Sequence, residues 1–99
     1  MKNLLQQLNQ MFENRVRLAI MSILVVNDGM DFNSLKSTLG LTDGNLASHV
    51  ATLEKHHYVS VTKKFVGKKP LTTYAATSPG RKALSEHLDA LEEIIRQTQ

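Results

Sequence analysis

The sequence predicts an α+β fold that is mainly α-helical and contains one small β-hairpin. Apolar residues recur at helical spacing through most of the chain, whereas residues 58–65 alternate between apolar and polar side chains. A turn rich in lysine follows the alternating segment. Because the chain has 99 residues, of which 41% are hydrophobic and 21% charged, we expect one globular domain spanning residues 1–99.

Two helices are expected before residue 30. The first is short, and its apolar residues at helical spacing are Leu4, Leu5, Leu8, Met11 and Phe12. Asn14 can cap the second helix, and the left-handed preference of Gly29 is expected to help end it after Asn27. The apolar stripe of the second helix consists of Val16, Ile20, Ile23, Leu24 and Val26, broadened by Leu18 and Met21.

A pair of helices is expected next, after a bridging strand at residues 30–32. A compact helix runs from Asn33 or Ser34 to Leu39, and Gly40 stops it. Thr42 can then cap a longer helix that continues to about His56. The two helices are therefore joined by a short turn.

A hairpin and a long final helix complete the chain. Residues 58–65 and 71–76 form the two strands, and Gly67 and Pro70 shape the turn between them. We expect Phe65 and Tyr74 to pack at the base of this hairpin. Residues 77–80 begin the last helix, with Pro79 at its first position, where the missing N–H costs nothing.

Positive charge is concentrated in the hairpin. Lys63, Lys64, Lys68 and Lys69 have no acidic residue between them, and without these four charges the net charge of the chain changes from +3 to −1. The segment from Arg81 onward is mildly acidic. We therefore expect one end of the molecule to attract phosphate and the other end not to.

Several classes of protein are excluded by what the sequence lacks. It has no cysteine, which excludes disulfides, thiolate metal sites and a cysteine nucleophile. No glycine-rich phosphate loop or plausible catalytic triad is present, so we expect neither an enzyme nor a cofactor. Glutamines interrupt the apolar N-terminus at once and no apolar run could span a bilayer, so we expect a cytoplasmic chain without membrane contact.

The chain resembles the winged helix-turn-helix transcriptional regulators related to the MarR and ArsR families, and within these the small stand-alone winged-helix DNA-binding proteins. The resemblance is carried by N-R-V-R-L-A-I-M-S-I-L (14–24), D-F-N-S-L-K (31–36), L-G-L-T-D-G-N-L-A-S-H-V (39–50), L-E-K (53–55), Y-V-S-V (58–61), K-F-V-G-K-K-P-L-T-T-Y (64–74), T-S-P-G-R-K-A-L (77–84) and L-D-A-L-E-E-I-I (88–95). It implies a dimeric regulator that binds duplex DNA, with helices at residues 1–12 and 78–99 contributing to the dimer interface.

The helix that begins near Thr42 is expected to read bases in the major groove. Leu46, Val50 and Leu53 share one face of it. The DNA-binding residues expected on this helix are Thr42, Gly44, Asn45, Ser48, His49 and Thr52. Asn45 can pair with adenine, and a phosphate can approach the helix N-terminus beside Gly44. The alternative is a solvated polar face without a ligand; Asp43 is interpreted as a capping or cytosine-contacting residue.

The hairpin is expected to act as a wing that contacts the phosphate backbone. Lys63, Lys64, Lys68 and Lys69 would neutralise phosphates and release counterions. The resemblance places Lys68 and Lys69 at the minor groove or its flanking phosphates. Many MarR-type wings carry an aspartate and an arginine that this wing lacks, so we expect sequence reading to rest more on the helix. The alternative role of these lysines is to keep an exposed hairpin from pairing with a neighbour.

The terminal helices are expected to form a homodimer interface. The residues concerned are Leu4, Leu5, Leu8 and Phe12 with Leu84, Leu88, Leu91 and Ile95. A two-fold dimer would present two recognition helices about one DNA turn apart on a palindromic operator. The alternative is that both helices fold only onto their own core.

No residue pattern indicates a metal or an effector. Regulators of this kind often respond to small molecules or metals, and the resemblance implies that His87 with Asp89 or Glu86 could contribute to an intersubunit site like that of metal-sensing ArsR proteins. Those sites use more histidine or cysteine, so we expect a structural or surface role for His87 and no metal. The predicted function is a homodimeric double-stranded DNA-binding transcriptional repressor; the alternatives are a protein–protein assembly module and a binder of RNA or single strands.

Overall fold

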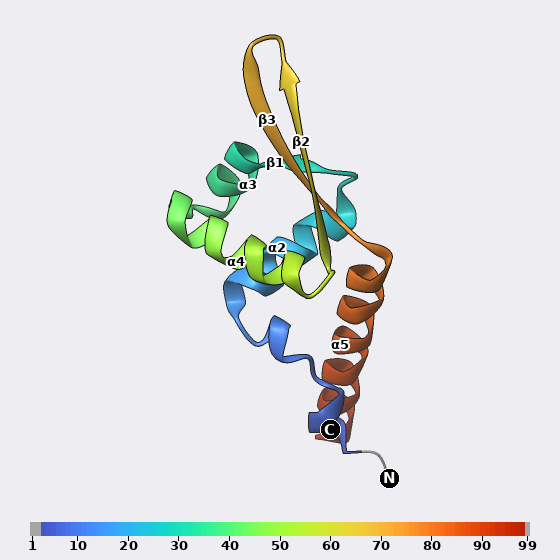
Figure 1. The fold of residues 1–99 in the computed structure, drawn as a ribbon. Coiled ribbons are helices and arrows are strands. Elements are labelled where there is room, and N and C mark those ends of the chain that lie inside the picture. The colour runs from blue at the N-terminus through green and yellow to red at the C-terminus, as the bar shows by residue number, and fades with distance from the viewer. Residues whose placement is uncertain (1–2, 99) are drawn as a thin grey trace.

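The computed structural model describes residues 3–98 (Figure 1). The described chain begins with α1 (Leu4–Gln7), a short 3₁₀ helix η1 (Gln10–Phe12) and α2 (Arg15–Val26). The strand β1 (Met30–Asp31), the helix pair α3 (Phe32–Leu39) and α4 (Asp43–Lys55), and the hairpin strands β2 (Val59–Val66) and β3 (Lys69–Ala76) follow. The last helix is α5 (Ser78–Gln97). The predicted α+β fold and the order of its main elements are confirmed.

Short polar side chains begin the helices, as the sequence predicts. The Asn14 side chain accepts hydrogen bonds from the N–H groups of Val16 and Arg17 at the start of α2. Thr42 accepts the N–H of Asn45 at the start of α4, and Thr77 accepts the N–H of Gly80 in α5. Each cap satisfies a backbone donor that has no partner inside the helix.

The sheet has three antiparallel strands in the order β1-β3-β2. Val59 pairs with Ala76 at the base of the hairpin and Val66 with Lys69 at its tip, so only Gly67 and Lys68 form the turn. Gly67 has a φ of 65°, in the left-handed region that favours glycine. Pro70 is therefore a strand residue rather than a turn residue. Because β1 pairs with β3 only at Thr73 and Tyr74, Pro70 interrupts no third strand.

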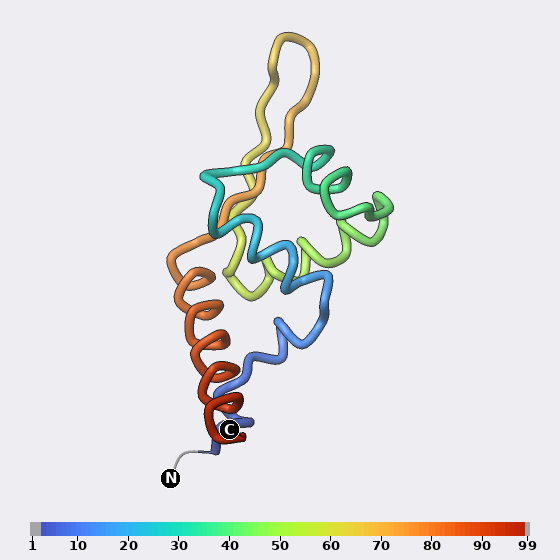
Figure 2. The backbone as a smooth tube through the Cα atoms, turned by 180° about the vertical axis from the view of Figure 1, so that it is seen from behind, coloured from blue at the N-terminus to red at the C-terminus, as the bar shows by residue number. Residues whose placement is uncertain are grey.

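The core lies where α2 crosses the helix pair and the base of the sheet. Six side chains have relative exposures near zero: Ile20, Met21, Leu24, Leu35, Leu46 and Leu53. The hairpin projects from one end of this body, and α5 extends from the other with α1 beside it (Figures 1 and 2). The molecule is consequently elongated, measuring 56 × 25 × 20 Å. Within residues 3–98, no helix combines the length and apolarity needed to cross a bilayer.

Several other local predictions were also wrong. The expected first helix is divided into α1 and η1, because Leu8 and Asn9 are extended and the Asn9 side chain caps η1 by accepting the N–H of Met11. Val26 does not join the apolar stripe of α2, since it is 80% exposed at the last position of the helix. Pro79 is the second residue of α5, after Ser78.

Candidate nucleic-acid interface

The inner face of α4 holds this helix firmly on the body. Leu46 and Leu53 are fully buried and Val50 is nearly so, and all three belong to the common core. At the start of α4, Gly40 ends α3 in the left-handed conformation with a φ of 65°. This conformation allows the chain to turn sharply between the two helices. The opposite face of α4 is therefore presented to the outside in a fixed orientation.

The outward face of α4 carries short polar side chains. Gly44, Asn45 and Ser48 are exposed, whereas His49 and Thr52 are half-buried. The Thr52 hydroxyl donates to the Ser48 carbonyl oxygen at 3.1 Å, which uses its hydrogen inside the helix. The side chains of Asn45 and Ser48 are thus the most accessible of the predicted base-reading groups. The Thr42 hydroxyl accepts the N–H of Asn45 as the helix cap.

An ion pair joins α3 to the first turn of α4. The Lys36 Nζ lies 2.7 Å from Asp43 Oδ1, and the Asp43 side chain is 76% exposed. Asp43 thus lies in the first turn of α4, where the helix dipole favours a carboxylate, and Lys36 partly offsets its negative charge. Lys36 is not among the site residues predicted from the sequence, although it lies in the helix that precedes Asp43.

A capping interaction also fixes the start of α3. Asp31 accepts the Ser34 hydroxyl at 2.6 Å and the Ser34 N–H at 3.1 Å. These hydrogen bonds, the hydroxyl first, hold the pKa of Asp31 below its usual value. The helix preceding α4 therefore begins at a defined point next to β1.

The hairpin of β2 and β3, which we call the wing, extends beyond α3 and α4 (Figure 1). Residues 62–70, the wing tip, are all exposed, and the four lysines of the sequence prediction lie within it. Tyr74 is buried at the base of the wing, and burial, followed by the charge of Glu54, raises its pKa. Phe65 is 73% exposed at the tip, so the prediction that it packs at the base was wrong.

The long helix α5 has two neighbouring apolar faces. One face is turned to the chain's own body and buries Gly80, Leu84, His87 and Ala90. The other face is open to solvent and carries Leu88, Leu91 and Ile95, which are 48%, 36% and 57% exposed. Leu5 of α1 is 71% exposed, while Leu4 and Leu8 are half-buried.

Two residues expected in the dimer interface lie instead in the core of the single chain. Phe12 is 2% exposed and Leu84 is 4% exposed, so neither has surface to offer to a second subunit. Phe12 stacks on Tyr58 with 5.7 Å between the ring centroids. The open apolar face of α5 is therefore narrower than the sequence stripe suggested.

His87 has a structural position between α5 and the N-terminal segment. It is 4% exposed, its Nδ1 accepts the backbone N–H of Asn9 at 3.0 Å, and the ring contacts Phe12 edge-on. Among residues 3–98, no group of three or more histidine and acidic side chains is arranged to hold a metal ion.

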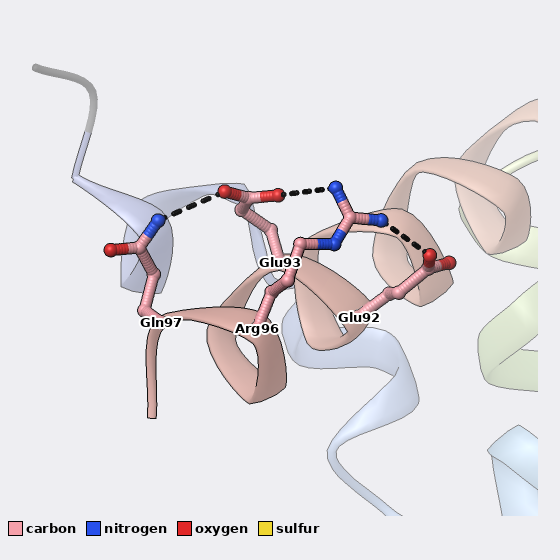
Figure 3. Close-up of polar contacts among 4 residues, drawn as sticks. All are labelled: Glu92, Glu93, Arg96 and Gln97. Atoms are coloured by element: carbon pink, nitrogen blue, oxygen red, sulfur yellow. Dashed lines mark hydrogen bonds and ion pairs between the residues drawn. The ribbon is translucent and has the colours of Figure 1, made fainter. Parts of the chain in front are cut away.

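The polar side of α5 is acidic and internally paired. The two guanidinium nitrogens of Arg96 contact Glu92 at 2.6 Å and Glu93 at 3.3 Å, and Gln97 donates to Glu93 (Figure 3). Lys82 and Glu86 form a further pair, at 3.9 Å. Within α5, residues 78–97, the charges of the polar side therefore offer no cluster of free positive charge to a polyanion.

This chain is similar to known proteins in both sequence and structure. Residues 16–95 match the family described as winged helix DNA-binding domain. An uncharacterized protein of Methanocaldococcus jannaschii, MJ0432, is 33% identical over 87 residues, which cover 88% of this chain and 95% of that protein.

The likeness extends to solved structures. The transcriptional regulator homologue protein from Pyrococcus horikoshii OT3 is 30% identical and has a TM-score of 0.85, covering 92% of this chain and 90% of that one. The MepR–DNA complex of S. aureus has a TM-score of 0.74 over 95% of this chain and 80% of that one. At 15% identity, the second likeness shows the fold alone. The winged helix expected from the resemblance is thus confirmed.

Proposed function

We propose that this chain, which belongs to the family of winged helix DNA-binding domains, represses transcription by occupying a palindromic duplex operator as a homodimer. The chain is a DNA-binding protein of the regulator type and not an enzyme. The similar protein of P. horikoshii is itself described as a transcriptional regulator homologue, which supports the assignment. The proposal concerns how the chain binds its site.

The observation that carries the proposal is the rigid, exposed polar face of α4. Asn45 and Ser48 project from a helix whose other side is fully buried at Leu46 and Leu53. A helix held in this way can place an amide and a hydroxyl against base edges in a major groove. The lysines of the wing tip would add phosphate contacts, which strengthen binding without distinguishing one sequence from another.

The open face of α5 supports the proposed homodimer. Leu88, Leu91 and Ile95 form a stripe that the chain's own body leaves exposed. An isologous contact through this stripe would relate two copies by a two-fold axis. The two α4 helices would then reach successive major-groove sites about 34 Å apart, on one side of the duplex. An operator occupied in this way would be closed to other proteins, which is the basis for proposing repression.

Selection from a pool of random duplexes tests this function. We expect enriched sites with dyad symmetry and half-sites about one helical turn apart. Asn45→Ala should relax the preference at one base pair per half-site, at a cost of about 1–3 kcal/mol for the favoured base. Lys68→Ala should weaken binding to all sequences similarly and reduce the slope of log affinity against log salt.

Two results would contradict the proposal. If no duplex were enriched, and the chain instead preferred unpaired strands or RNA in competition, the operator model would be wrong. If duplexes were enriched without dyad symmetry and the chain remained monomeric at the concentrations of binding, the homodimer would be wrong.

A further inference from the structure

The wing tip exposes two large apolar side chains in addition to its lysines. Phe65 is 73% exposed and Val66 is 61% exposed, and they are adjacent in the chain. Single exposed apolar residues are common on protein surfaces. Here, however, they lie next to the turn of a projecting hairpin, and lysines stand on both sides of them in the sequence. The ligand of the wing tip should therefore suit both apolar and cationic side chains.

The register of the wing places Phe65 on a defined side. Successive residues of a strand point to opposite faces, so Phe65 shares a face with Val59 and Val61, which lie on the core side of the sheet. Its cross-strand partner on this face is Pro70. The core side is also the side on which the helical body packs. Phe65 and Pro70 thus form an apolar end to the wing face that is continuous with the body carrying α4.

The opposite face of the wing tip is more polar. Val66 is paired there with Lys69, and Lys64 with Leu71. The apolar end of the core-side face is bordered by Lys63, two pairs nearer to the body. An apolar tip flanked by cations matches a duplex minor groove, in which the phosphates form the walls and the stacked bases the floor.

We propose that Phe65 is an apolar wedge, which enters the minor groove beside the site read by α4, partly unstacks one base step and bends the duplex. The lysines of the wing alone would bind the phosphates that form the groove walls. A phenyl ring can in addition interrupt the stacking of the bases at the floor of the groove. Steps of pyrimidine followed by purine unstack most easily, so the wedge adds a preference for such a step at the edge of each half-site. This inference rests on the proposed function.

The test places 2-aminopurine, whose fluorescence rises on unstacking, at single steps near the ends of a duplex recovered from the random pool. Binding is followed by anisotropy in the same titration. We expect the fluorescence to rise at one step in each half-site with the native protein and with Phe65→Leu, which keeps an apolar side chain. Phe65→Ala should abolish the rise but weaken binding by less than about tenfold, because the lysines remain.

Val26→Ala is the matched control. Val26 is 80% exposed but lies at the end of α2, outside the wing, so its replacement should leave both signals unchanged. Because Phe65 is largely exposed, Phe65→Ala should retain the native thermal unfolding, which a circular dichroism melt checks.

The outcomes separate the wedge from the proposed function. The wedge would be wrong if the native protein bound the duplex without any rise in fluorescence. It would also be wrong if the rise persisted in Phe65→Ala. In both cases the operator model would stand. The wedge would also be wrong if Phe65 instead anchored the chain to phosphatidylserine vesicles and had no effect on duplex fluorescence. Absence of duplex binding altogether would overturn both.

Discussion

The wing tip and the far half of α5 lie at opposite ends of the long axis, and both expose apolar side chains (Figure 1). They differ in the charges around those side chains. Lysines alone surround Phe65 and Val66, whereas Leu88, Leu91 and Ile95 share their helix with Glu86, Asp89, Glu92 and Glu93. The two exposed apolar patches therefore differ in the sign of the charges that surround them.

The difference supports the proposal of a separate partner for each end. A polyanion gains from four lysines at the wing and is repelled by the carboxylates of α5. A second copy of the chain can cover the apolar stripe of α5 while the carboxylates stay at the rim in water, where charged groups are usual. The following predictions test this separation, from the largest expected effect to the smallest.

Reversing two charges at the wing should have the largest effect. Lys68→Glu combined with Lys69→Glu should weaken duplex binding by about a thousandfold near 0.1 M salt, because a dimer would lose four phosphate contacts. Fluorescence anisotropy at several salt concentrations should show the slope reduced by about 4. The control is Lys82→Glu on the polar side of α5, which should change affinity little. Equal losses from the two variants would show that the two ends are not electrostatically distinct.

Placing charges on the open face of α5 should separate the subunits. Leu88→Glu with Ile95→Glu should give a folded monomer in sedimentation equilibrium, because two carboxylates cannot be buried in an apolar contact without large cost. Duplex affinity should fall by about a hundredfold, because the two α4 helices of a dimer would then bind independently. Lys82→Glu again serves as the control and should leave the dimer intact. A double variant that still dimerised would place the interface elsewhere.

A substitution at Gly80, near the start of α5, should change the free energy of unfolding but neither the wing tip nor the open face of α5. A Cβ added at Gly80 would lie 2.2 Å from the Tyr58 carbonyl oxygen, so α5 cannot cross this point with a larger residue without moving. Gly80→Ala should lower the free energy of unfolding by about 3 kcal/mol in urea titrations. Gly44→Ala is the matched control, because nothing lies within 4 Å of a Cβ there. A native-like stability for Gly80→Ala would mean that α5 shifts freely.

A smaller loss is expected from the cap of α5. Thr77 accepts the N–H of Gly80 at 3.0 Å and donates to the His57 carbonyl oxygen at 2.6 Å. Thr77→Ala should reduce the free energy of unfolding by about 1 kcal/mol, while Thr77→Ser, which keeps the hydroxyl, should lose much less. Thermal melts of the two variants provide the measurement. Identical losses would assign the effect to the methyl group and not to the cap.

Local signals were sufficient for most of the fold. The caps at Asn14, Thr42 and Thr77 depend on residues within three positions, so they could be predicted from short stretches of sequence. The inward face of α4 followed from helical periodicity alone. The left-handed conformation at Gly40 likewise matched its position after a short helix.

The errors arose where distant segments meet. The burial of Leu84 and Phe12 depends on how α5 and η1 pack on the body, and one apolar stripe cannot reveal that α5 has two apolar faces. The structural role of His87 was one of two predicted alternatives, and the sequence could not decide between them because its partner, the Asn9 N–H, is 78 positions away. Phe65 was misplaced because alternation marks the side of a strand but not how far along that strand the core extends.

The separation of charge along the 56 Å axis also has a kinetic consequence. Fields are screened over about 10 Å at 0.1 M salt, so the carboxylates of α5 do little to weaken the attraction at the wing tip. If the chain binds duplex DNA through its wing as proposed, the wing should arrive first in an encounter, and approaches with α5 foremost should be discouraged. The rate of association should fall as salt is added, even for sequences that α4 does not recognise.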